Sequence, residues 1–452
     1  MAYITRTTGT ATDKKKFTYS AWLKLTNIEV YQRPIQNYVD GNNRGYILYH
    51  HNTDANPNTW FFYDRISSQI NFQATSVAKY RDTNGFYHLV VRADTTQSTQ
   101  ADRYRVYINN EQIDLNISVN IGQNVDLGFN SSSANLRIGG TESGSEPWKG
   151  IMSHVHFCDG QSYAPTEFGE YDANGVWKIK TSPSVTYGNN GYWVFKDDAS
   201  VTDRSGNGNN FTLSGSITKT EDCPSNVFPT INPLTYSTTK WNLEYGNLRT
   251  NGLFSGESAA WRSVYGTLGA SSGKYYFEMK VTRTYSVDSN NIIIGIVDAE
   301  QMKYEGDNGK FFGTSRGYGY HAKDGKKLNN DSVTANGVNY GNSWTTNDII
   351  GCAFDLDNHK LYFSKNGSWQ NSGDPTSGAT GTGSAFDLAT GYTYLPTVSH
   401  FYDDDRIEFN FGNGYFGTTA VASAGTNASG NGIFEFDCPN GYTALSTKGL
   451  NL

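Results

Sequence analysis

The chain has 452 residues, and its 43 acidic side chains outnumber its 36 Lys and Arg side chains, giving a formal net charge of −7. No block of basic residues interrupts this acidic balance, so the sequence lacks the electrostatic footprint of a nucleic-acid-binding protein. No apolar run approaches the length of a membrane span, and the opening residues MAYITRTTGT contain no apolar core of a signal peptide, so we expect synthesis in the cytoplasm.

The first part of the chain alternates strand and turn signals. In FTYSAWLKL (residues 17–25), apolar side chains recur at every second position, and RYRVYINNEQID (residues 103–114) adds a strand that ends in an Asn-Asn turn. Pro165 suits the first position of one short helical turn. We therefore predict a first β-sandwich domain over residues 1–200.

The composition changes after residue 200. DRSGNGNNFTLSGS is rich in Gly, Asn and Ser, and EDCPSNVFPTINPL carries Pro224, Pro229 and Pro233. Segments with this density of Gly and Pro are typical of linkers. The sequence thus predicts a linker or extended strap over residues 201–245.

Strand signals return in the last part of the chain. GCAFDLDNHKLYFSKNGSW (residues 351–369) places Cys352, Phe354 and Leu356 on one face of a strand. Asn366-Gly367 then forms a strong hairpin signal, because both central residues of a type I′ turn need positive φ. We predict a second antiparallel β-sandwich over residues 246–452, and an all-β fold class for the whole chain. The four cysteines show no C-x-x-C spacing and are predicted to be free thiols: Cys158, Cys223, Cys352 and Cys438.

Two known families are similar to these segments. Residues 15–200, with FTYSAWLKL, FYHLVVRAD, YRVYINN and WKGIMSHVHF, resemble a laminin-G-like, concanavalin-A-type jelly roll. Residues 246–452 resemble a SPRY domain through GKYYFEMKV, IIIGIVD, DIIGCAFDLDNHKLYFSKNGSW and IEFNFGNGYF. The order of the two domains resembles virion structural proteins of bacteriophages, particularly marine ones.

The resemblance implies a function in binding. It implies a non-enzymatic subunit on the virion surface, such as a decoration, head-fibre or tail-associated (tail-fibre) protein, made in the host cytoplasm. Its partners would be neighbouring virion proteins, a host-surface glycan or receptor, and further copies of itself as a homo-oligomer. Two alternatives remain open: a carbohydrate-active hydrolase of the concanavalin-A-like class, and a cellular SPRY interaction adaptor.

The acidic residues do not favour the hydrolase. Glucanases of this class need alternating carboxylates in the pattern E-x-D-x-x-E so that the acids face one cleft. The nearest segment begins at Glu435, lacks the third acid, and is interrupted by Pro439. His154 and His156 share a strand face, but zinc would need further ligands. We therefore predict no enzyme and no catalytic residues.

The candidate ligand- or partner-binding residues are aromatic side chains near predicted loops. Tyr and Trp give large, rigid contact areas, and loops on a rigid scaffold commonly carry function. The alternative is that these side chains pack in the core. In SPRY domains, as the resemblance implies, partners are held by loops at one end of the sandwich, here around residues 261–265, 313–318, 369 and 402–405. The candidates are Trp261, Tyr265, Tyr318, Trp369 and Tyr402.

One acidic cluster is a candidate metal site. Asp403, Asp404 and Asp405 precede the strand RIEFNF, and three carboxylates in a loop suit Ca²⁺, which prefers oxygen ligands. The alternative is a solvated strand entry that resists aggregation, since no EF-hand-like spacing accompanies the cluster. No other cofactor is expected.

Overall fold

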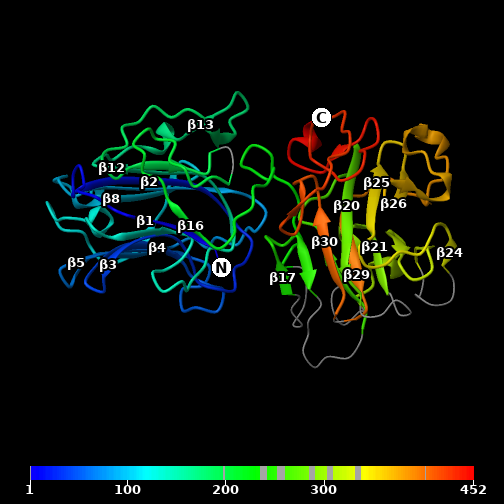
Figure 1. Cartoon of the computed structure of the whole chain (residues 1–452), viewed down its shortest axis with the longest axis horizontal. Coiled ribbons are helices and arrows are strands. Elements are labelled where there is room, and N and C mark those ends of the chain that lie inside the picture. Colours follow the sequence, from blue (N-terminus) through cyan, green and yellow to red (C-terminus); the bar gives the residue numbers. More distant parts are fainter. Residues whose placement is uncertain are drawn as a thin grey trace. The chain divides into compact units, whose positions relative to one another are not determined.

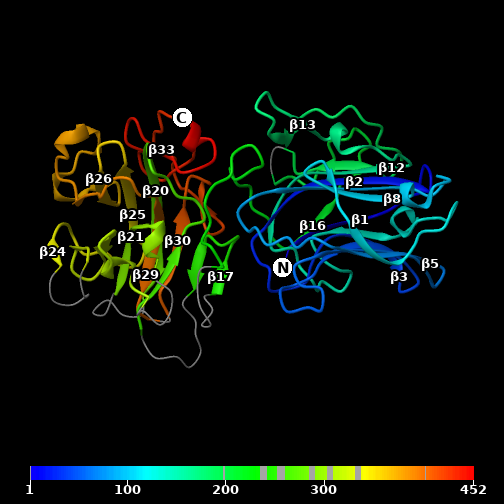
Figure 2. The ribbon, with the colours of Figure 1, turned by 180° about the vertical axis from the view of Figure 1, so that it is seen from behind.

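A computed structural model of the chain describes residues 2–196, 199–234, 242–251, 260–284, 291–302, 309–330, 337–402 and 404–452. The chain divides into two units, Met1–Lys219 and Thr220–Leu452. Each unit is an antiparallel β-sandwich, so the predicted all-β fold class is confirmed (Figures 1 and 2). The helical segments among the described residues are short 3-10 turns: η1 (Gln100–Asp102), η2 (Gly128–Asn130), η3 (Pro165–Glu167), η5 (Ala299–Gln301), η6 (Phe311–Gly313), η7 (Gln370–Ser372), η8 (Pro375–Thr380) and η9 (Gly449–Asn451).

The first unit packs an eight-stranded sheet against a six-stranded sheet. In spatial order, the larger sheet contains β10 (Leu115–Val119), β6 (Gln69–Ser76), β5 (Trp60–Ile66), β4 (Asn43–Tyr49), β3 (Gln32–Asp40), β11 (Asn135–Ile138), β1 (Tyr3–Thr7) and β16 (Thr212–Ser214). The smaller sheet contains β15 (Tyr192–Val194), β12 (Gly150–Asp159), β2 (Lys16–Leu25), β7 (Tyr87–Asp94), β8 (Tyr104–Ile108) and β9 (Glu111–Gln112). A separate hairpin pairs β13 (Gly169–Tyr171) with β14 (Trp177–Ile179).

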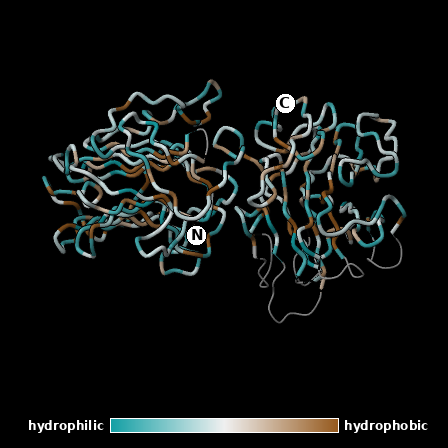
Figure 3. The backbone as a smooth tube through the Cα atoms, viewed as in Figure 1, coloured by the Kyte–Doolittle hydropathy of each residue, from teal (hydrophilic) through white to brown (hydrophobic). Residues whose placement is uncertain are grey.

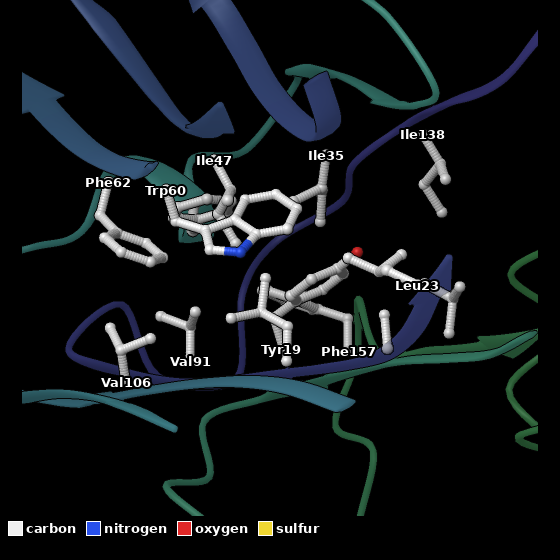
Figure 4. Close-up of a cluster of buried hydrophobic side chains, with 14 of the residues drawn as sticks. Tyr19, Leu23, Ile35, Ile47, Trp60, Phe62, Val91, Val106, Ile138 and Phe157 are labelled. Carbon is white, nitrogen blue, oxygen red and sulfur yellow. The ribbon is translucent and has the colours of Figure 1, made fainter. Parts of the chain in front are cut away.

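The core of the first unit lies between these sheets. The alternation predicted for β2 is confirmed, since Phe17, Tyr19 and Leu23 are fully buried between the sheets. Side chains from the two sheets face one another in Figure 4: Ile35, Ile47, Trp60, Phe62 and Ile138 from the larger sheet, and Tyr19, Leu23, Val91, Val106 and Phe157 from the smaller one. Along both units, hydrophobic residues recur in the strands, while loop sequence is largely hydrophilic (Figure 3).

The second unit repeats the sandwich plan with different strands. Its larger sheet contains β17 (Asn242–Glu244), β18 (Arg249–Asn251), β30 (Arg406–Asn410), β20 (Lys274–Arg283), β25 (Ile349–Asp355), β26 (Lys360–Lys365) and β27 (Ser368–Trp369), with β28 (Phe386–Asp387) on β26 and β33 (Thr443–Ala444) parallel to β20. The facing sheet contains β19 (Arg262–Tyr265), β29 (Tyr394–His400), β21 (Ile292–Asp298), β22 (Gly317–His321), β23 (Lys326–Leu328) and β24 (Val338–Asn339). A small hairpin pairs β31 (Tyr415–Phe416) with β32 (Thr419–Ala420). As predicted, Cys352, Phe354 and Leu356 are core residues, and Leu361 and Phe363 on β26 belong to the same core.

A buried carboxylate fixes the C-terminal segment to the outer face of the larger sheet. Glu278 on β20 is fully buried and accepts the backbone N–H groups of Glu435 and Phe436, each at 2.8 Å. The Tyr276 hydroxyl donates to Glu278 at 3.1 Å and the Asn410 amide at 3.2 Å. Burial raises the pKa of Glu278 to about 7. This carboxyl group therefore joins two strands of the sheet to a segment more than 150 residues away in the sequence.

The structure differs from the predicted linker over residues 201–245. Residues 212–214 form β16, which pairs with β1 and completes the first sandwich. Further along, Phe228 and Ile231 are buried within the second unit. Residues 235–241 lie outside the described residues. The described parts of the segment therefore belong to the two sandwiches, although their composition is typical of a linker.

Two loops with the same pattern explain how glycine-rich sequence becomes fixed structure. Residues 203–208 read DRSGNG and residues 427–432 read NASGNG. In both loops, the first side chain accepts the backbone N–H and the hydroxyl of the serine two positions on, at 2.7 to 3.2 Å. The amide of Asn207 then donates to carbonyl oxygens at Gly188 and Gly191, while the amide of Asn431 donates to oxygens within residues 443–446. Short polar side chains thus hold each loop to its own sandwich.

Candidate functional site

The predicted binding aromatics do not share one surface. Tyr265 is fully buried, Trp261 is 7% exposed and Tyr318 is 5% exposed. Trp261 and Tyr265 pack with Phe311 and Phe312 of η6, which covers the outer face of the sheet that holds β19 and β21. Tyr318 on β22 packs in the core between the sheets. These three side chains are buried core residues, which is the alternative to partner binding that the sequence left open. They offer no surface for a partner.

Tyr402 lies at an end of the second sandwich where several strands meet. The register pairs the start of β19 and the start of β21 with the end of β29, since Arg262 and Ile292 both lie opposite His400. Phe401 and Tyr402 follow directly and are partly exposed, with their ring centres 4.9 Å apart. The other face of this pair rests on the core, because Phe401 lies 5.3 Å from Trp261. The aromatic pair is therefore supported by the core on one side, and its side chains are partly exposed on the other.

A charged pair borders these aromatic rings. Arg283, at the end of β20, donates to Asp404 at 2.6 Å, and its side chain is 49% exposed. Both residues lie at the same end as Tyr402, because Arg283 is opposite Arg406 at the start of β30. We call the group Arg283, Phe401, Tyr402 and Asp404 the aromatic end. Exposed Tyr and Arg side chains on a rigid support are the residue types that dominate protein interfaces.

The predicted calcium site is only partly within the described residues. Asp403 lies outside them, Asp404 already pairs with Arg283, and Asp405 is fully buried. Within the described ranges, no group of three or more His, Cys, Asp or Glu side chains is arranged to hold a metal ion. Calcium binding therefore stays a prediction, and the neighbouring guanidinium is an alternative partner for the acidic loop.

Trp369 lies apart from the aromatic end, on the edge strand β27. It is partly buried and packs against Tyr276 and Tyr362, with ring centres 6.2 and 6.5 Å away. These contacts make it part of the cover over the outer face of the larger sheet. Trp369 therefore has a structural role. Its sequence position just after the Asn366-Gly367 turn did not predict these packing contacts.

Replacing Trp369 tests how much of this role is structural. Trp369→Ala is expected to lower the free energy of unfolding by about 1–2 kcal/mol, because only part of the indole is buried. Phe354→Ala, which empties a fully buried site, is expected to lower it by about 3–5 kcal/mol. Urea denaturation of both variants of the intact chain makes the comparison. Equal losses in the two variants would assign Trp369 wholly to the core.

The first domain contains a serine–histidine contact that the sequence could not reveal. Ser20 Oγ lies 2.8 Å from His88 Nε2, and the Trp177 indole N–H donates to His88 Nδ1 at 3.1 Å. An indole nitrogen is only a donor, so Nδ1 must accept and Nε2 must carry the proton. His88 therefore donates to Ser20 and cannot take its proton as a general base would. The pair is a structural contact under the β13–β14 hairpin.

Burial keeps this histidine neutral. His88 is fully buried and stacks on Trp22, with ring centres 4.6 Å apart and planes 8° apart. Loss of hydration lowers the pKa of His88 to about 3. The unfolded chain takes up a proton near the ordinary histidine pKa of about 6.5, whereas the folded chain does so only near 3. The stability that neutral His88 contributes is therefore present above pH 6.5 and is lost as pH falls toward 3.

We expect the first domain to be destabilised by acid, by a total on the order of 4 kcal/mol for this one group. His88→Gln, which stays neutral at every pH, is expected to flatten the pH dependence of the first domain's melting temperature. His51→Gln, a change at a partly exposed histidine of the same domain, is the matched control. Identical pH profiles in the two variants would show that His88 does not cause the acid sensitivity.

The acidic segment that begins at Glu435, which was compared with the glucanase pattern, accepts hydrogen bonds from backbone N–H groups. Glu435 accepts the backbone N–H of Ala422 at 2.7 Å, and Asp437 accepts that of Thr426 at 2.6 Å. Each carboxylate is thus engaged with a different backbone N–H group, that of Ala422 or that of Thr426. Their geometry favours structural roles over an acid–nucleophile pair.

Comparison with known proteins identifies both domains. Residues 2–162 match the concanavalin A-like lectin/glucanases superfamily, and residues 274–414 match the SPRY domain. The chain is therefore a two-domain β-sandwich protein in which a concanavalin A-like domain precedes a SPRY domain. Among the described residues, no helix has the length and apolar character needed to cross a membrane.

The similar curated proteins are longer than the matched region. A Ran-binding proteins 9/10 homolog of Drosophila melanogaster is 31% identical over 158 residues, which cover 34% of this chain and 14% of the relative. Ran-binding protein 9 of Xenopus tropicalis is 29% identical over 129 residues, covering 28% of this chain and 22% of the relative. The chain thus spans less than a quarter of either relative. Among solved structures, the SPRY domain of human HERC1 is 16% identical with a TM-score of 0.30, over 40% of this chain and 96% of that chain.

Proposed function

We propose that the protein is a non-catalytic interaction protein whose SPRY domain binds a partner protein at the aromatic end. The observation that carries this proposal is the partly exposed Phe401–Tyr402 pair beside the exposed Arg283, on strands of a SPRY domain. Interface energy concentrates in a few Tyr, Trp and Arg side chains on rigid supports. The similar proteins named as Ran-binding proteins support a role in binding. The adaptor function is therefore the one we favour.

The test compares partner capture by three forms of the intact chain. Wild type, a variant with Tyr402→Ala and Arg283→Ala, and the control Glu300→Ala are used as bait in lysate from the source cells. Glu300 is an exposed residue at the opposite end of β21, so its loss leaves the aromatic end unchanged. We expect a partner that wild type and Glu300→Ala capture and the double variant loses. A partner retained by all three forms would contradict the proposal for this end of the domain.

A place on a bacteriophage virion is a second candidate. The order of a concanavalin A-like domain followed by a SPRY domain favours it, and the partners would then be other virion proteins or a host-surface glycan or receptor. The relatives named above are animal proteins and lend this placement no support. Immunogold labelling of purified virions distinguishes the two: labelled particles support the virion role, and unlabelled particles leave the cellular adaptor.

A further inference from the structure

The outer face of the larger sheet in the first domain carries two arginines on facing strands. Arg44 on β4 lies directly opposite Arg65 on β5, and the next pair along the same face is Tyr46 opposite Tyr63. Phe61 continues the face along β5. Side chains alternate between the two faces of a strand, and Ile47 and Phe62 point into the core in Figure 4. The set Arg44, Tyr46, Phe61, Tyr63 and Arg65, here called the Arg–Tyr face, therefore lies on the outside.

The rings of Tyr46 and Tyr63 lie close to the guanidinium of Arg44. It lies 5.5 Å from the ring centre of Tyr63 and 6.0 Å from that of Tyr46, and the two tyrosine rings stack 4.9 Å apart. A guanidinium over aromatic rings gains cation–π attraction and loses conformational freedom. Arg44, Tyr46, Phe61 and Arg65 are each partly exposed. Arg33, which pairs with Glu146, lies 3.9 Å from the ring centre of Tyr46, so the face presents positive charge beside aromatic rings that are only partly exposed.

The two arginines differ in their acidic surroundings, because the charge of Arg65 helps to lower the pKa of the nearby Asp40 carboxyl group, after its hydrogen bonds with Asn42 and Asn43. Within the described part of the chain, Arg44 has no ion pair, and Arg65 donates only to the carbonyl oxygens of Gly41 and Ser68. Asp64 points to the opposite face, into the core, where it accepts the backbone N–H of Gly128. The remaining carboxylates near the face are already engaged: Asp40 with the N–H groups of Asn42 and Asn43, Glu142 with Gln36, and Glu146 with Arg33.

The facing pair Arg44 and Arg65 points to an anionic partner. Like charges directly opposite on neighbouring strands destabilise a sheet, and a carboxylate bound at this face would offset that repulsion. A guanidinium binds carboxylates through paired N–H groups, and Tyr with Arg is the composition of protein interfaces.

We propose that the Arg–Tyr face binds an acidic peptide segment of a partner protein. Arg44 and Arg65 pair with its carboxylates, and the rings of Tyr46 and Phe61 pack against its side chains. The whole chain is acidic, with a net charge of −7, so the positive charge of this face is a local feature. The surface lies on the concanavalin A-like domain and extends the binding role beyond the SPRY domain.

The test uses a fluorescently labelled octaglutamate peptide and the intact chain. Anisotropy titration at low salt is expected to show binding that weakens as salt rises, because charges at an exposed face are screened. Arg44→Gln is expected to lower the affinity at least tenfold, and Arg44→Lys, which keeps the charge without the planar fork, by less. Arg81→Gln, at an exposed arginine outside the face, is the matched control and is expected to bind as wild type does.

Two kinds of result would overturn the proposal, one for binding of the peptide, which can fail in either of two ways, and one for the class of ligand. The first is a failure of wild type to bind octaglutamate at low salt, or equal affinity in Arg44→Gln and Arg81→Gln. The second is Arg44-dependent binding of a sialylated oligosaccharide without binding of octaglutamate, which would assign the face to acidic glycans. The variant with Tyr402→Ala and Arg283→Ala is expected to bind octaglutamate normally, so this test and that of the aromatic end can fail separately.

Discussion

A fragment that begins at residue 246 is expected to lack a cooperative thermal transition, whereas a fragment that begins at residue 220 is expected to melt as one unit. The shorter fragment lacks Phe228 and Ile231, which are 1% and 0% exposed in the second sandwich. It also lacks the backbone bonds from Ile231 to Asn247 and from Asn232 to Tyr265. Loss of the two apolar side chains alone removes about 5–10 kcal/mol, which is comparable with the whole stability of a typical domain.

Circular dichroism melting of the two fragments makes this comparison. The variant Phe228→Ala in the longer fragment is expected to melt at an intermediate temperature, since it loses one of the two side chains. If the fragment from residue 246 melts as cooperatively and at the same temperature as the longer one, residues 220–245 do not belong to the second fold. The original expectation of a separable strap would then be correct.

Replacing Glu278 is expected to be among the most destabilising single changes in the second domain. Glu278→Ala leaves the backbone N–H groups of Glu435 and Phe436 buried without acceptors, and each such group costs about 1–3 kcal/mol. With the cavity that remains, we expect a total loss of about 3–6 kcal/mol. Glu300→Ala, at an exposed glutamate, is the control and is expected to change stability by less than about 0.5 kcal/mol.

The pH dependence of the same group gives a second measurement. The folded pKa of Glu278, about 7, lies above its unfolded value of 4.5, so its stabilising effect is complete below pH 4.5 and is lost as pH rises through 7. The full difference corresponds to about 3 kcal/mol. The free energy of unfolding of the second domain is therefore expected to fall as pH rises from 4.5 to 7 and to level off above pH 7, where Glu278 is ionised in both states. Urea denaturation across this pH range makes the measurement, and a free energy of unfolding that shows no such fall would mean that the protonation of Glu278 does not affect stability.

The alternation of apolar and polar residues along the strands could be read from the sequence, because a strand with one buried face requires it. Phe17, Tyr19 and Leu23 on β2, and Cys352 and Phe354 on β25, occupy the core positions that their spacing predicts. The pairing of segment 201–219 with the first sandwich could not be read from the sequence, because a Gly- and Asn-rich composition does not show where side chains find acceptors. Asp203 is fixed to the backbone N–H of Trp193 at 2.9 Å, and this contact depends on the folded arrangement.

The candidate sites show the same limit. Tyr265 and Tyr402 both fall near predicted loops, yet Tyr265 is covered by η6, a segment more than 40 residues away in the chain. The contact of Ser20 with His88 and Trp177 joins three separate strands, so no local motif could signal it. The Arg–Tyr face required the register of β4 on β5, because alternation alone places Arg44 and Arg65 outside but does not set them opposite each other.

The position of β1 has a consequence for how the chain is made. β1 lies between β11 and β16 in the sheet, so residues 3–7 pair with residues 135–138 and 212–214. At translation rates of about 5–20 residues per second, the first strand waits roughly 10–40 s for its second neighbour to emerge from the ribosome. During that time Ile4, which is buried in the finished core, and the strand's free edge are open to other chains. A ribosome-bound chain halted before residue 212 is therefore expected to expose this unpaired edge of β1 to other chains.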